Sequence, residues 1–121
     1  MNDLGFPGDI PADEMADYLR LYVDETGEQL DGLVQTILAL KATPTDARQL
    51  DEAFRLLHSI KGASALLGLD GITTLTDQLE IHFVRLRSGK DTVDATVSVV
   101  LGCIDGVRDC TERLRPRSVA D

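Results

Sequence analysis

Apolar residues recur every three or four positions in four successive stretches, and this spacing is what most limits the possible fold. The stretches cover residues 13–42, 47–67, 71–88 and 92–114. An α-helix repeats every 3.6 residues, so each stretch predicts an amphipathic helix. The last stretch is rich in valine and threonine, which favour strands. Because Val97, Val100, Ile104 and Val107 keep helical spacing, we predict a helix there as well.

Turn-forming residues separate the four stretches. We predict that Thr43 or Thr45 caps the second helix and that Gly68 ends it in the left-handed conformation. Asp70 is expected to cap the third helix, and Gly89 to end it. Amphipathic helices joined by such short connections pack most simply as an antiparallel up-down-up-down bundle. The predicted fold class is therefore all-α, a four-helix bundle.

One domain accounts for most of the chain. We assign residues 13–115 to the bundle, residues 1–12 to a flexible lead-in rich in glycine and proline, and residues 116–121 to a tail or the start of a linker. Aromatic residues make up only 4% and tryptophan is absent, so the core must be aliphatic. Cys103 and Cys110, seven residues apart on one helix, are too far apart for a disulfide and are expected to be free thiols.

The charge balance argues against several classes of partner. With 21 acidic and 12 basic residues the formal net charge is −9, which disfavours binding to nucleic acid phosphates. The acidic N-terminus lacks the basic and apolar regions of a signal peptide, and no apolar run approaches the roughly 18 residues that cross a bilayer. We therefore expect a cytoplasmic protein that does not contact the membrane.

The sequence LHSIKGASALLG, residues 57–68, places a histidine among aliphatic residues. At about 100° per residue, His58 lies about 140° from Ala53 on the apolar stripe, so we predict that it is outside the core. Lys61 and Gly62 follow one turn later on the same side. A lysine there can neutralise a phosphoryl group on the imidazole, and the glycine leaves room for another protein's backbone.

A carboxylate on the next helix is expected at the height of this histidine. His58 and Glu80 are equally far from the turn at position 69, so Glu80 can accept a hydrogen bond from Nδ1–H and leave Nε2 as the nucleophile. An ordinary solvated glutamate is the alternative. His82 is near the same height, but it falls on the opposite edge of its helix from Glu80. We therefore predict no metal site and interpret His82 as half-buried and structural.

These residues carry a family resemblance. The segment HSIKGASALLG resembles the signature of histidine-containing phosphotransfer (HPt) domains, with lysine at +3, glycine at +4 and a small residue at +10. FRLLHSIKG and LTDQLEIHFVRLRSGK, followed by one more long helix, stand in the order of the N-terminal phosphotransfer domain of CheA-type chemotaxis kinases. The similarity extends over about residues 13–115.

The resemblance implies a four-helix bundle, in some members with an additional terminal helix. It implies that His58 accepts a phosphoryl group at Nε2 from an ATP-bound histidine kinase domain and passes it to an aspartate of a response-regulator receiver domain. Lys61, Gly62 and Glu80 match the family's lysine, glycine and imidazole-orienting glutamate. ATP and magnesium would be bound by the partner domains, so this chain would be a monomeric carrier rather than an enzyme. Arg55 and Ala65 would join Gly62 in the docking surface.

Two positions depart from the family's pattern. Ala63 stands where many CheA-type domains have a second glycine, and Asp77 stands where they often carry an auxiliary histidine. An acid at position 77 would repel an incoming phosphoryl group modestly, which puts the rate in doubt more than the reaction. We expect the N-terminal module of a CheA-like kinase. The alternatives are a separate HPt protein of a multistep relay and a helical interaction domain that is not phosphorylated.

Overall fold

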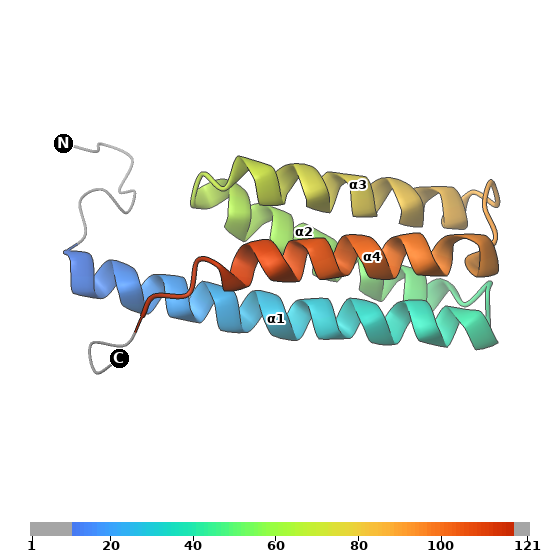
Figure 1. The fold of residues 1–121 in the computed structure, drawn as a ribbon. Coiled ribbons are helices and arrows are strands. Elements are labelled where there is room, and N and C mark those ends of the chain that lie inside the picture. Colours follow the sequence, from blue (N-terminus) through green and yellow to red (C-terminus); the bar gives the residue numbers. More distant parts are fainter. Residues whose placement is uncertain (1–10, 118–121) are drawn as a thin grey trace.

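The computed structural model describes residues 11–117, and this part of the chain folds into helices without strands (Figure 1). The helices are α1 (Ala12–Ala42), α2 (Ala47–Leu66), α3 (Asp70–Arg87) and α4 (Val93–Glu112). They confirm the all-α prediction, including a helix in the valine-rich last stretch. No fifth helix follows α4 within the described residues.

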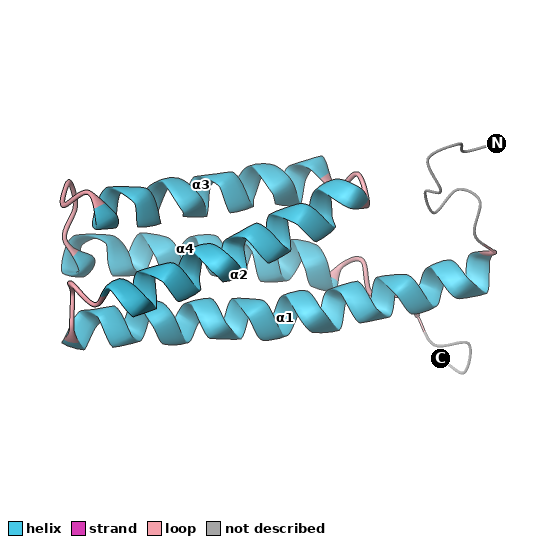
Figure 2. Ribbon diagram, turned by 180° about the vertical axis from the view of Figure 1, so that it is seen from behind, coloured by secondary structure: helices cyan, strands magenta, loops and turns pink. Residues whose placement is uncertain are grey.

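The helices form an antiparallel bundle in which each one packs against two neighbours. The packed pairs are α1 with α2, α2 with α3, α3 with α4, and α4 with α1. Helix α1 has 31 residues, against 18 to 20 in the others, and is therefore roughly 17–20 Å longer. Its N-terminal part extends beyond the end of the bundle, as Figure 2 shows.

The core is mainly aliphatic, as the composition predicts, and Phe83 is the largest of its fully buried side chains in the part of the chain that the structure describes. Phe83 is fully buried on α3, and its ring meets the half-buried Phe54 ring of α2 edge to face, with 6.4 Å between the ring centroids. The fully buried aliphatic side chains come from all four helices. They include Leu30, Leu33, Ile37, Leu40, Leu57, Ile60, Leu79, Val100, Ile104 and Val107.

A buried hydroxyl pair, Tyr22 and Ser64, links α1 to α2 nearly two turns beyond the histidine. Ser64 donates to the carbonyl oxygen of Ile60 at 2.7 Å, so its single proton is used. Tyr22 therefore donates to Ser64 Oγ, also at 2.7 Å. Burial raises the pKa of the Tyr22 phenol. Ser64 can therefore be fully buried on the core side of α2, because its hydroxyl both donates and accepts a hydrogen bond.

Two of the predicted helix ends are wrong and two are confirmed. The cap of α2 is Asp46, whose carboxylate accepts from the Arg48 amide at 3.0 Å, rather than Thr43 or Thr45. Pro44 lies in the turn before α2, which moves the helix start past both threonines.

Asp70 is the first residue of α3 rather than its cap, because the backbone of Leu69 occupies that position without a side-chain hydrogen bond. Gly68 and Gly89 follow the ends of α2 and α3 with φ of 72° and 73°, as predicted. This left-handed conformation favours glycine because it has no Cβ.

The remaining predictions concern the chain ends, the membrane and the thiols. Most of the predicted lead-in, residues 1–12, and most of the predicted tail, residues 116–121, lie outside the described residues. No helix in residues 11–117 is both long and apolar enough to cross a membrane. Cys103 and Cys110 are free and half-buried on α4.

Candidate functional site

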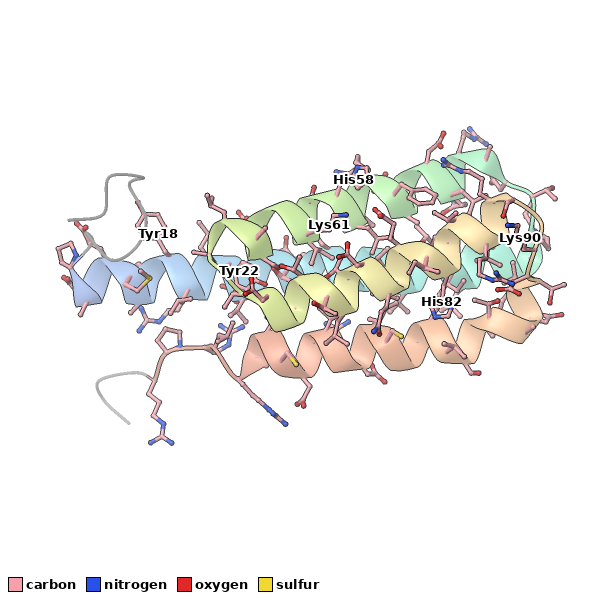
Figure 3. The ribbon with its side chains drawn as sticks, turned by 90° about the horizontal axis from the view of Figure 1, so that it is seen from above. Tyr18, Tyr22, His58, Lys61, His82 and Lys90 are labelled. Atoms are coloured by element: carbon pink, nitrogen blue, oxygen red, sulfur yellow. The ribbon has the colours of Figure 1, made fainter. Side chains whose placement is uncertain are left out.

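His58 lies in the middle of α2 and points away from the core. Its side chain is 68% exposed, although the flanking Leu57 and Ile60 are fully buried. The helical angle that placed it off the apolar stripe is therefore confirmed. Figure 3 shows its ring on the outer side of α2. An imidazole in this position is accessible to another protein while its backbone is held by a packed helix.

The α2–α3 hairpin brings Glu80 to this histidine, as equal distance from the turn predicts. His58 Nε2 lies 3.2 Å from Glu80 Oε2. The two atoms are not aligned for a hydrogen bond, and Oε2 is buried with no hydrogen-bond partner among the described residues. The carboxylate is thus available to an N–H of the ring once the ring is aligned with it.

The ring nitrogen that faces Glu80 differs from the predicted one. We expected Nδ1 to meet the carboxylate, and the structure places Nε2 there. Nε2 is on the far side of the ring from the α2 backbone, and the carboxylate comes from the neighbouring helix, so an outstretched ring reaches it with Nε2 first. Helical arithmetic fixes the height and side of a residue, but it does not fix the torsion angles of its side chain.

The side chain of Lys61 extends from α2 toward α3, where two carboxylates bind its ammonium group (Figure 3). Its Nζ is 3.0 Å from Asp77 Oδ1 and 3.5 Å from Glu80 Oε1. The contact with Asp77, and then the charge of Glu80, raise the pKa of Lys61. The predicted cation is therefore present beside His58, and it is already paired. Sequence reasoning missed the Asp77 contact, although Asp77 precedes Glu80 by three residues and so shares its side of α3.

The small residues of the predicted docking surface are exposed next to His58. Gly62 and Ala65 lie on the solvent side of α2, and a Cβ added at Gly62 would meet no atom within 4 Å. Arg55, one turn before His58, is also exposed and pairs with Glu52 on its own helix. On one side of the imidazole, Gly62 and Ala65 therefore leave the α2 backbone accessible to a partner. On the other side, Arg55 presents a guanidinium group.

His82 does not join His58. It is half-buried on the side of α3 that faces α4, away from His58 (Figure 3). Residues 11–117 contain no group of three or more histidine, cysteine, aspartate or glutamate side chains that could hold a metal ion. The site consequently consists of one exposed imidazole, two carboxylates and one ammonium group.

Comparison with known proteins places this arrangement in a family. The model of the family described as Hpt domain matches residues 17–115, which is most of the chain. The chain belongs to the Hpt domain family. The CheA phosphotransferase domain from Thermotoga maritima has a similar structure, with a TM-score of 0.76 and 27% sequence identity, over 84% of this chain and 97% of that one. The antiparallel bundle and the family resemblance are thus confirmed together.

Longer relatives of this chain include a chemotaxis protein and a sensor histidine kinase. The chemotaxis protein CheA of Bacillus subtilis is 29% identical over 82% of this chain, and the sensor histidine kinase CheAY of Helicobacter pylori is 32% identical over 77%. The chain spans only 17% and 12% of the lengths of those two proteins. The similarity therefore concerns their Hpt part.

Proposed function

We propose that this Hpt domain is a phosphohistidine carrier of two-component signalling, and that His58 is the residue that is phosphorylated. The observation that supports the proposal best is an imidazole that is 68% exposed on a helix of an Hpt bundle, within 3.2 Å of a carboxylate from the neighbouring helix. His82, the other histidine, is half-buried against α4 and pairs with no carboxylate within residues 11–117.

The chemistry needs a neutral imidazole with a lone pair on Nε2. That lone pair attacks the γ-phosphorus of ATP held by a kinase domain, the N–P bond forms, and the bond from phosphorus to the ADP oxygen breaks. Nδ1 keeps its proton throughout, so the ring becomes cationic and carries the phosphoryl group. In the second step a receiver-domain aspartate displaces the imidazole at phosphorus, and the neutral ring is restored.

Glu80 would act on the ring's orientation and charge. With the proton on Nδ1, the Nε2 lone pair would face the Glu80 carboxylate at 3.2 Å, which is unfavourable. The exposed ring can turn until Nδ1–H meets the carboxylate, which leaves Nε2 directed at the partner. Glu80 then stabilises the cationic phosphorylated ring, because its buried Oε2 accepts the hydrogen bond it lacks in the resting state.

The partner domains would provide the rest of the catalytic machinery. We assign ATP and magnesium to the kinase domain, because phosphoryl transfer depends mainly on positioning and charge neutralisation around the nucleotide. The chain itself is a carrier rather than a catalyst, and it would work in the cytoplasm, where ATP is found. The CheA relatives favour the phosphotransfer module of a CheA-like kinase over a separate HPt protein.

The test is labelling of the chain by a CheA kinase domain with ATP and magnesium, followed by mass mapping of the phosphorylated peptide. We expect acid-labile phosphate on His58, no labelling of the His58→Gln variant, and normal labelling of His82→Gln as the matched control. Undiminished labelling of His58→Gln would refute the assignment. A folded wild-type chain that is not labelled would favour the interaction domain that is not phosphorylated.

A further inference from the structure

The charges around His58 are unfavourable for an incoming phosphoryl group. Lys61 contributes one positive charge, and Asp77 and Glu80 contribute two negative charges within 3.5 Å of its ammonium group. Arg55, the other cation near His58 on α2, pairs with Glu52. A phosphoryl group on the His58 ring would bring further negative charge close to the Glu80 carboxylate, which lies 3.2 Å from Nε2 in the resting domain. Within this chain, neutralisation of the phosphoryl charge therefore depends on whether the Lys61 ammonium group contacts the carboxylates or the phosphoryl group.

Lys61 can leave its ion pair with Asp77 and contact another anion instead. Asp77 is the nearer of the two carboxylates to Lys61 Nζ in the resting domain, at 3.0 Å against 3.5 Å for Glu80. The Asp77 side chain is 51% exposed, so water can replace the ammonium group without leaving a buried charge. Glu80 is less exposed and faces His58, so Lys61 can keep its contact with Glu80 while it leaves Asp77.

We propose that Asp77 is a positioning residue that holds the Lys61 ammonium group in an ion pair beside His58 in the resting domain, and that this ammonium group moves from Asp77 to the phosphoryl group once His58 is phosphorylated. The inference rests on the proposed function of His58. Lys61 supplies its charge to phosphohistidine only after the ion pair with Asp77 is broken. Asp77 thereby lowers the stability of the phosphorylated form and favours onward transfer.

The sharpest test is the phosphorylation equilibrium rather than the rate. The ratio of phosphorylated to free chain at a fixed ATP to ADP ratio depends only on the free energies of the two forms, so it is independent of how well a kinase docks. An exposed ion pair limits the effect, and Asp77→Asn should raise the equilibrium constant by about two- to fivefold. Fivefold corresponds to about 1 kcal/mol.

Two comparisons separate a role through Lys61 from a general charge effect. Asp105→Asn makes the same charge change on an exposed part of α4, where Asp105 has no ion pair among the described residues, and it should leave the equilibrium constant unchanged. In a Lys61→Met background, Asp77→Asn should change it no more than Asp105→Asn does. An equal effect of Asp77→Asn with and without Lys61 would show direct repulsion and overturn the proposal.

A measurement on the unphosphorylated chain distinguishes failure of this inference from failure of the proposed function. Titration of the Lys61 side chain by NMR should give a lower pKa in Asp77→Asn than in the wild type, because the contact with Asp77 raises it. An unchanged Lys61 pKa would overturn the inference even if His58 is phosphorylated. Wild-type chain that is never labelled, with the pKa change present, would refute the proposed function of His58 instead.

Discussion

The substitution Gly62→Ala should separate the stability of this domain from its function. Glycine within a helix is less stable than alanine by about 0.5–1 kcal/mol, because its unfolded state has more freedom. Gly62 is exposed within α2, and an added Cβ would meet no atom within 4 Å, so no clash offsets the gain. For a domain of this size, Tm should rise by roughly 2–8 °C.

The same methyl group should impair phosphorylation. Gly62 lies one turn from His58 on the exposed face, where we expect the kinase and receiver domains to approach the backbone closely. A partner displaced by about 1 Å can lose up to 10²-fold in rate, so we expect kcat/KM for phosphorylation of the chain to fall by about tenfold or more. The assay is initial-rate labelling by a CheA kinase domain over a range of chain concentrations.

Gly102→Ala is the matched control. Gly102 is likewise exposed within a helix, and an added Cβ there also meets nothing within 4 Å, but it lies on α4. It should raise Tm by a similar amount and leave kcat/KM unchanged. If Gly62→Ala slows phosphorylation no more than Gly102→Ala does, the docking surface assigned to Gly62 is wrong. A lower Tm for Gly62→Ala would contradict the open space around that glycine.

Three further outcomes test the site and the core. Glu80→Gln should slow labelling of His58 while Tm stays close to that of the wild type, which labelling rates and thermal melts check; an unchanged rate would contradict an orienting role. Because burial raises the pKa of Tyr22 above its ordinary value of 10.0, stability should be intact below pH 10 and fall as pH rises through the raised pKa. Denaturant melts of the wild type and Tyr22→Phe at pH 8 and pH 11 test this, and the wild type should lose more stability between them. Phe83→Ala should destabilise the fold by about 3–5 kcal/mol, since Phe83 is fully buried, and a loss below 1 kcal/mol in such melts would argue against the packed core.

The sequence was sufficient to predict the helices and the meeting of His58 with Glu80. A residue's angle on a helix and its distance from a turn are set by regular backbone geometry, so the exposure of His58 and its meeting with Glu80 followed from counting. Gly68 and Gly89 marked helix ends because they adopt positive φ. These features depend on the backbone and on residue type, both of which can be read locally.

The features that were missed depend on side-chain torsion angles and on competition between near-equal alternatives. Asp46, Thr45 and Thr43 are all acceptable caps, and only the path of the chain after Pro44 selects Asp46. The ring nitrogen that faces Glu80 depends on the rotamer of His58. The partner of Lys61 depends on which carboxylate of α3 its flexible side chain reaches. In the structure it contacts both Asp77 and Glu80.

The site residues lie on the surface of the bundle rather than in its core, so mutation can change their function without changing the stability of the fold. His58, Lys61 and Asp77 each expose about a third or more of the side chain, whereas the residues that hold α2 in place are fully buried on its other face. Replacing a site residue therefore removes charge or a nucleophile without opening a cavity. A variant of His58, Lys61 or Asp77 that loses phosphotransfer should keep its melting temperature within a few degrees, because surface changes shift stability by about 0.5 kcal/mol or less. Loss of both together would mean that the site residue also supports the packing of α2 against α3.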